Sequence, residues 1–245
     1  MLAEYLNILF YFGALILLSY LLDRMWMYSM ARYVYLVFAA PGIMIHELSH
    51  YAACKITGAK VTKVVLMSKT GGSVTHGKPK GGVLGQAFVS MAPFIGIPLV
   101  LILLGLMFDQ FLGCEIIWEP DLDGNVGSVI LNTIGSSFEM IYRNIVDLSA
   151  YWFVIYLLIS ASLTIALAPS KQDFKNAVWG LIAVLGGIFI WIVIILRIAP
   201  SWPFPILGTI FDMMGWIIVV GFVLSFIGMI IGMPFALIKY LRKKD

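Results

Sequence analysis

The most evident deficit of this 245-residue sequence is charge. Only 12% of its residues are Asp, Glu, Lys or Arg, whereas about 25% is typical of soluble domains. Hydrophobic residues make up 61% of the chain, and the mean hydropathy is +0.98. This composition excludes an ordinary soluble domain and indicates a membrane protein folded as one compact unit. We therefore expect a lipid bilayer around the chain and no nucleic-acid partner.

Cysteine is also scarce. The two cysteines, Cys54 and Cys114, are too few for a disulfide framework, and the predicted topology places them on opposite sides of the membrane. A cleavable signal peptide is not expected either. Residues 5–22 are apolar, but Glu4 precedes them and no small-residue cleavage site follows. We interpret residues 5–22 as a retained membrane span.

Six apolar segments approach the length of about 20 residues that a helix needs to cross a bilayer. They cover approximately residues 5–22, 33–55, 83–108, 150–167, 176–197 and 213–238. Pro93 and Pro98 lie in the third segment and predict a kink there. The predicted fold class is thus an all-α polytopic membrane protein, with residues 1–245 forming a single membrane domain.

Two segments between the spans have a different pattern. Valines at 61, 64, 65 and 74 flank a Lys-Thr-Gly-Gly turn, which predicts a small β-hairpin between the second and third spans. In the acidic segment 109–149, apolar residues from Ile134 to Leu148 recur at spacings of three and four. That spacing predicts an amphipathic helix along the membrane interface.

The distribution of Lys and Arg predicts an orientation. If both termini lie on one side of the membrane, twelve of the 16 basic residues fall on that side. The exceptions are Arg24, Arg32, Arg143 and Arg197. Because cytoplasmic loops are enriched in Lys and Arg, we predict a multi-pass cell-membrane protein with both termini cytoplasmic. The segment 109–149 then lies outside.

His46, Glu47 and His50 interrupt the second apolar segment. The two histidines are four residues apart, so on a helix they lie one turn apart on the same face. Both rings could then bind one Zn²⁺, and Glu47 could take a proton from the metal-bound water as a general base. The alternative is a pair of histidines that only form hydrogen bonds inside the bundle. Ionisable groups in a membrane span are costly and by default mark a function, which favours the metal site.

A catalytic zinc site needs a third protein ligand and an open position for water. Asp173 lies between the fourth and fifth spans, on the same side of the membrane as the motif, and is the favoured candidate. The alternatives are His76, on the predicted hairpin, and Glu139, in the outer segment.

Together these residues resemble the site-2 proteases, a family of intramembrane zinc metalloproteases built on a core of three membrane helices. The resemblance runs through residues 33–180. It comprises the His46–His50 motif in a span, the segment GAKVTKVVLMSKTGGSV, a helix with GQAFVSMAPFIGIPLV, and an aspartate after a proline-bearing turn. The plan of six spans is similar to that of archaeal members.

The resemblance implies specific roles. His46, His50 and Asp173 would bind one zinc ion, and Glu47 would be the catalytic carboxylate. Residues 33–180 would form the catalytic core, and the substrate would be a membrane protein cut in or near a transmembrane helix.

A helical amide is shielded by its own hydrogen bonds, so such a substrate must unwind locally before water can attack it. The predicted hairpin offers an exposed edge that could hold the unwound strand by β-addition. Gly71 and Gly72, in its turn, are therefore candidate substrate-binding residues.

Two other functions stay open. The segment after Pro169 reads Ser-Lys-Gln-Asp, without the Asn and the Leu-Asp-Gly triplet usual in the family. This departure favours a proteolytically inactive, zincin-like scaffold or regulator, whereas the intact Glu47 favours an enzyme. A prenyl-protein-type membrane metalloprotease would instead use Glu139 as the third ligand.

Overall fold

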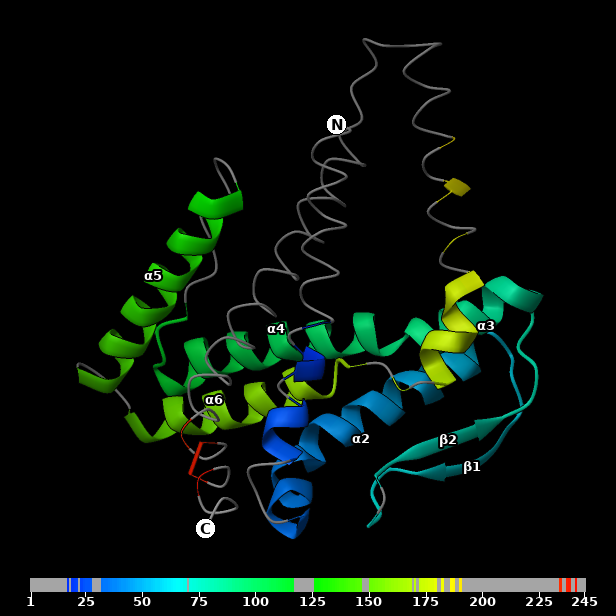
Figure 1. Cartoon of the computed structure of the whole chain (residues 1–245), viewed down its shortest axis with the longest axis horizontal. Coiled ribbons are helices and arrows are strands. Elements are labelled where there is room, and N and C mark those ends of the chain that lie inside the picture. The colour runs from blue at the N-terminus through cyan, green and yellow to red at the C-terminus, as the bar shows by residue number, and fades with distance from the viewer. Residues whose placement is uncertain are drawn as a thin grey trace.

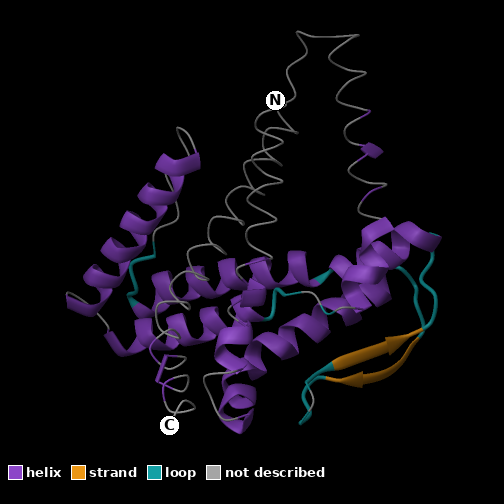
Figure 2. Ribbon diagram, viewed as in Figure 1, coloured by secondary structure: helices purple, strands orange, loops and turns teal. Residues whose placement is uncertain are grey.

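The computed structural model describes residues 32–116 except Thr70, 126–146, 150–168, 170 and 172–179. It also describes residues 17, 19–21 and 23–27 and isolated positions from 182 onward. This part of the chain is mostly helical, with one small antiparallel sheet (Figure 1, Figure 2). The elements are α2 (Arg32–Ile56), β1 (Val61–Val65), β2 (Ser73–His76), α3 (Gly82–Met91), α4 (Pro93–Leu112), α5 (Val126–Val146) and α6 (Ala150–Ile165).

Helices α2, α4 and α6 pack against one another at the centre of the described chain, with the hairpin at one end and α5 at the other (Figure 1). Small residues let these helices approach closely. A methyl group on Gly42 of α2 would lie 2.1 Å from the carbonyl oxygen of Ser162 on α6. A methyl group on Gly96 of α4 would lie 2.1 Å from the hydroxyl of Ser49 on α2. The positions of both glycines therefore fix how α2 sits against its neighbours.

The most apolar helical stretch is Gly82–Leu112, where α3 and α4 meet at Ala92 and Pro93 begins α4. Within the described residues it is the one helical stretch that is long and apolar enough to cross a membrane. Its outer side exposes a row of apolar side chains: Ile95, Leu99, Leu103, Leu106, Met107 and Phe111. A helix that is apolar on its buried and its exposed side is typical of a membrane environment. The break at Ala92 agrees with the interruption that Pro93 predicts, whereas Pro98 lies inside α4 without ending it.

Helices α2 and α6 occupy the predicted second and fourth spans. Helix α2 has 25 residues but carries the polar motif, and α6 has 16 residues. The spans predicted at 5–22, 176–197 and 213–238 lie largely outside the described residues. The predicted six-span topology thus stays a prediction.

The hairpin between α2 and α3 is confirmed. Strand β1 pairs antiparallel with β2, with Val61 opposite His76 and Val65 opposite Ser73. Val61 and Val74 pack against a buried cluster from α2 and α3 that includes Cys54. This packing attaches the sheet to the helices and sets where its turn lies.

The acidic segment contains the predicted helix, which begins earlier than expected, at Val126. Met140 and Asn144 of α5 are buried, and the Asn144 side chain accepts a hydrogen bond from the Glu115 N–H at 2.8 Å. Phe138, which belongs to the predicted apolar face, is exposed. Both cysteines are buried and free, in agreement with the expected lack of a disulfide between them.

Candidate metal centre

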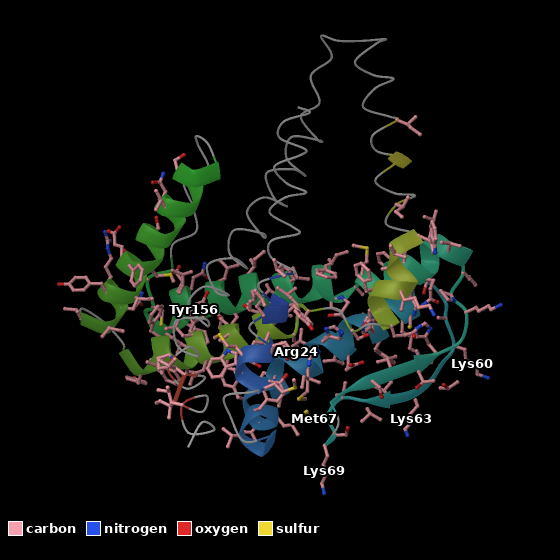
Figure 3. The ribbon with its side chains drawn as sticks, in the orientation of Figure 1. Arg24, Lys60, Lys63, Met67, Lys69 and Tyr156 are labelled. Carbon is pink, nitrogen blue, oxygen red and sulfur yellow. The ribbon has the colours of Figure 1, made fainter. Side chains whose placement is uncertain are left out.

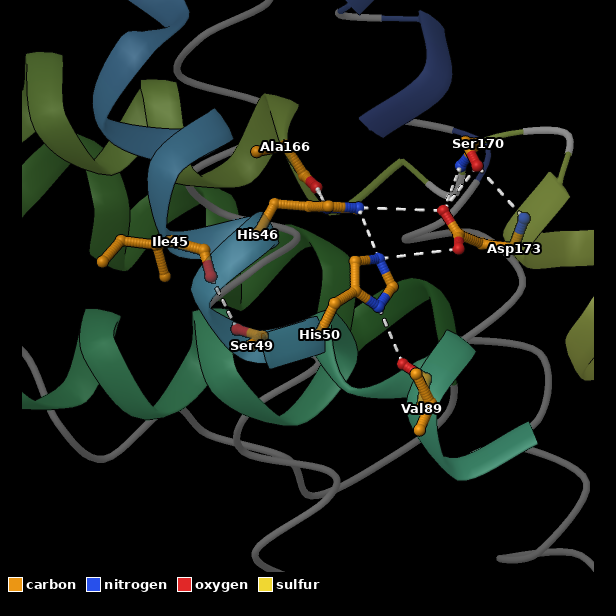
Figure 4. Close-up of polar contacts among 8 residues, drawn as sticks. All are labelled: Ile45, His46, Ser49, His50, Val89, Ala166, Ser170 and Asp173. Carbon is orange, nitrogen blue, oxygen red and sulfur yellow. Dashed lines mark hydrogen bonds and ion pairs between the residues drawn. The ribbon is translucent and has the colours of Figure 1, made fainter. Parts of the chain in front are cut away.

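His46 and His50 are one turn apart on α2, and each ring is held by a backbone carbonyl from another segment (Figure 4). His46 Nδ1 lies 2.6 Å from the oxygen of Ala166, just beyond the end of α6. His50 Nδ1 lies 2.7 Å from the oxygen of Val89 in α3. A carbonyl oxygen can only accept, so both Nδ1 atoms carry the proton and donate it.

This arrangement leaves the two Nε2 atoms facing each other. They are 3.1 Å apart, and the rings meet edge to face with an interplanar angle of 75°. In the neutral form of each ring, Nε2 then presents a lone pair and no proton. Two lone pairs pointed at each other indicate a site for a shared cation, and the fixing of Nδ1 by a carbonyl is typical of histidines that bind metals.

Asp173 completes the group from a third segment, the helix at residues 172–179. Its Oδ1 lies 3.5 Å from His50 Nε2, and its Oδ2 lies 3.8 Å from His46 Nε2. The three side chains can each offer one ligand atom, and these atoms all lie within 4.8 Å of one another. The structure thus brings together the three residues that the sequence singled out from opposite ends of the proposed core.

Ser170 orients Asp173, and sequence reasoning missed it. The Ser170 hydroxyl donates to Asp173 Oδ2, and the Asp173 N–H donates back to Ser170 Oγ at 3.1 Å. The Ser170 N–H also points at Oδ2, at 3.3 Å. This reciprocal pattern is a capping box at the start of the helix, and the Ser-x-x-Asp spacing in the sequence was the available signal.

The neighbours of Asp173 stabilise its charged form. Burial alone would raise the pKa of this carboxyl, but the Nε2–H groups that His46 and His50 carry in their doubly protonated form, together with the Ser170 hydroxyl, outweigh burial and hold the pKa well below its usual range. When both rings are neutral and face a metal ion through Nε2, the cation would stabilise the ionised carboxylate in their place.

The donor set fits a divalent metal ion. Two ligands at 2.0–2.1 Å from a tetrahedral Zn²⁺ are separated by about 3.3 Å. The two Nε2 atoms are 3.1 Å apart, close to that value, and the nearest Asp173 oxygens are 3.5 Å from His50 Nε2 (Oδ1) and 3.8 Å from His46 Nε2 (Oδ2). With one ligand atom from each residue, all three atoms lie within 4.8 Å of one another. Two imidazoles and one carboxylate are a common ligand set for catalytic zinc, which keeps a further position open.

Glu47 lies on α2 next to the group and is only 8% exposed. It lines a cavity of about 280 Å³ together with His46 and Gly72. A methyl group on Gly72 would lie 2.4 Å from Glu47 Cγ. The turn side of the hairpin is thus placed directly against the carboxylate that the sequence assigns to catalysis.

The other candidates are not brought to the group within the described residues. Glu139, on α5, forms an ion pair with Arg143. His76, at the end of β2, contacts the Gly77 carbonyl oxygen through Nδ1 at 2.8 Å. Gly71 has a φ of +110°, and no other residue lies within 4 Å of its Cβ position. Gly71 therefore serves the turn, while Gly72 touches the site.

Comparison with known proteins gives no match: no family model, no curated protein sequence and no solved structure corresponds to this chain. The chemistry of the group is therefore the basis for assigning a function.

Proposed function

We propose that this protein is an intramembrane zinc metalloprotease of the site-2 protease type, which hydrolyses a peptide bond in or near a transmembrane helix of a membrane protein. The observation that carries the proposal is the convergence of His46 Nε2, His50 Nε2 and an Asp173 carboxylate oxygen beside a buried glutamate. If these residues only formed ion pairs, the lone pairs of the two imidazole rings would not need to face each other.

Each residue has a distinct role in this proposal. His46, His50 and Asp173 hold one zinc ion, which when bound supplies a Lewis acid and a water of lowered pKa. Glu47 accepts a proton at its carboxylate and later returns it to the leaving amine as a general acid. The low exposure of Glu47 keeps bulk water away from this proton transfer.

The hairpin supports substrate binding. Gly72 has no side chain, so an extended peptide could approach Glu47 along the backbone next to β2. A side chain at this position would occupy the space beside the carboxylate. Gly72 is therefore the better candidate for a substrate contact, and Gly71 shapes the turn that presents it.

The membrane location is part of the same proposal. The exposed apolar row of α4 and the length of Gly82–Leu112 support association with a membrane. We propose a multi-pass protein with cytoplasmic termini, on the basis of the six apolar segments and the distribution of Lys and Arg. The lysines of the hairpin would then face the cytoplasm.

The test compares wild type with Glu47→Gln, reconstituted in lipid, in the cleavage of a reporter protein that carries a single transmembrane helix. The expected result is cleavage by the wild type and a loss of at least about 100-fold in the variant, because Gln cannot accept a proton. Zinc content serves as the control, since it should be equal in both proteins. Equal product formation by both would contradict the proposal, and no cleavage by either would favour the scaffold or regulator.

A further inference from the structure

The cavity beside the metal centre contains a second polar element, the arginine Arg24. The residues that line the cavity include His46, Glu47 and Gly72, and also Asp23, Arg24 and Tyr35. The distribution of Lys and Arg along the sequence predicts that Arg24 lies on the outer side of the membrane. The structure instead places its side chain on the wall of the same cavity as the candidate catalytic glutamate.

Several contacts fix the segment that carries Arg24. The Ser19 hydroxyl donates to the Thr164 carbonyl oxygen of α6 at 2.6 Å. Trp26 is buried and stacks on Phe38 of α2, with ring centroids 4.6 Å apart. Because contacts before and after Arg24 hold this segment against α6 and α2, the backbone at Arg24 is fixed beside the cavity.

Within the part of the chain that the structure describes, no carboxylate pairs with the Arg24 guanidinium. Its Nε atom is buried and has no hydrogen-bond partner, and within the described residues Arg24 forms no ion pair. Its described contact is with the face of the Tyr20 ring, 5.1 Å from the ring centroid. The neighbouring Asp23 accepts a hydrogen bond from the Tyr35 hydroxyl.

An arginine in this position is unlike the lysines of the hairpin. Figure 3 shows Arg24 among the helices at the centre of the molecule, whereas Lys60, Lys63 and Lys69 extend outward from the hairpin. A partly buried charge is costly unless it is paired, and in a membrane protein it marks a functional site. The cost is offset when a ligand supplies the missing anion.

We propose that Arg24 forms a subsite for a carboxylate group of the substrate, next to the metal centre. A planar guanidinium binds a carboxylate through two parallel hydrogen bonds, and contact with a tyrosine ring holds the plane in orientation. Among the described residues that line the cavity, Arg24 is the one lysine or arginine, and Asp23 and Glu47 are its acidic residues. Arg24 is therefore the position where a substrate carboxylate is accepted. The carboxylate belongs to an acidic side chain or to the C-terminus of the substrate. That the ligand is a substrate rests on the proposed function.

The test uses binding and not cleavage. The probes are alkyl hydroxamates, which bind zinc, in a series of increasing chain length that ends in a carboxylate, with a matched series that ends in a carboxamide. Affinity is measured on the zinc-loaded full-length protein in detergent. In the wild type, the carboxylate probe of the best length should bind about 10–100-fold more tightly than its carboxamide match. Arg24→Gln should abolish this preference and leave the binding of an unsubstituted hydroxamate unchanged.

Two further variants test whether the preference follows the charge at position 24. Arg24→Lys keeps the positive charge and should retain part of the preference, and Arg24→Glu should shift the preference to a probe that ends in an amine. The wild-type comparison needs no variant, so it can overturn the proposal even if all three variants fail to fold. Equal affinity of the wild type for carboxylate and carboxamide probes at every length would overturn it, as would a preference that survives in Arg24→Gln.

A second set of probes distinguishes the two sources of the carboxylate. Helical peptides with a free or an amidated C-terminus, and with an internal Glu or Gln, are bound to the Glu47→Gln protein. A preference for the free C-terminus or for internal Glu identifies the source, and no preference in either pair overturns the proposal. A carboxylate preference without any cleavage of the reporter would reject the protease proposal and leave the Arg24 subsite standing.

Discussion

Gly72 of the hairpin lies directly against Glu47 of α2: a methyl group at Gly72 would be 2.4 Å from Glu47 Cγ and 3.0 Å from its Oε1. Real side-chain carbons essentially never come so close, so Glu47 can keep its position only while residue 72 has no side chain. This contact joins two features that are 25 positions apart in the sequence, the metal-binding motif and the glycine turn. It places the backbone of the hairpin at the group that we propose as the general base.

Replacing Gly72 with Ala is therefore expected to displace the Glu47 carboxylate. We expect a loss of cleavage of about 10–100-fold, because a displacement of about 1 Å at a reacting group has an effect of this size. Zinc content should not change, since Gly72 is not part of the ligand group. The matched control is Ser73→Ala at the next residue, which is exposed on β2 and should cleave like the wild type. Wild-type activity in Gly72→Ala would contradict this role.

Ser170 is expected to contribute to metal affinity without binding the metal. In Ser170→Ala, Asp173 loses the hydroxyl that holds its Oδ2. Loss of such an orienting partner typically lowers metal affinity by about 10–100-fold. Competition with a fluorescent zinc chelator measures the change. Gln172→Ala is the control, because the exposed Gln172 side chain pairs with Asn176 on the same short helix. Equal losses in both variants would show that the helix, and not the hydroxyl, matters.

Removal of the metal is expected to lower the thermal stability. A ligand at 100 times its dissociation constant stabilises the folded state by about 2.7 kcal/mol, which corresponds to a shift in Tm of about 5–10 °C for a chain of this size. Chelation should produce this shift in the wild type and none in Asp173→Ala. Differential scanning fluorimetry in detergent, with zinc added back, is the measurement. A shift of the same size in Asp173→Ala would indicate that zinc binds elsewhere.

The contact between α2 and α6 leads to a prediction about stability. Gly42→Ala would place a methyl group 2.1 Å from the Ser162 carbonyl oxygen, and backbone cannot yield as a flexible side chain can. We expect a loss of about 1–3 kcal/mol or more in the free energy of unfolding. The control is Gly135→Ala on α5, where the new methyl group would lie within 4 Å of no described residue beyond its chain neighbours and the local helix backbone. There, the replacement of a helical glycine should stabilise by about 0.5–1 kcal/mol. Thermal unfolding measures the stability of both variants. Equal changes in stability in Gly42→Ala and Gly135→Ala would contradict the close contact.

Local patterns in the sequence were sufficient for the hairpin, for α2 and for the two histidines, because spacing on a strand or a helix decides which side chains share a face. The predicted topology favours Asp173 as the third ligand, because it lies on the same side of the membrane as the motif. Its contact with the histidines, however, depends on packing between segments more than a hundred residues apart. Ser170 stands three residues before Asp173, the spacing of a capping box, but a serine is not a usual zinc ligand, so the search for ligands does not select it.

The position of Arg24 could not be predicted. Its place depends on contacts of Ser19 and Trp26 with α6 and α2, and neither residue belongs to a recognisable motif. A count of charges by loop treats Arg24 as a surface residue, whereas the packing of its segment turns it toward the cavity. Long-range packing is thus the part of the site that local sequence patterns do not contain.

We propose that His46, His50 and Asp173 bind one zinc ion, and the zinc content of the purified full-length protein tests this directly. We expect about one zinc ion per chain in the wild type and in Glu139→Ala, since Glu139 pairs with Arg143 on α5. We expect a large loss of zinc in Asp173→Ala, because the Asp173 carboxylate lies 3.5 Å from His50 Nε2 in the wild type. If Asp173→Ala retained its zinc and Glu139→Ala lost it, Asp173 would not be the third ligand.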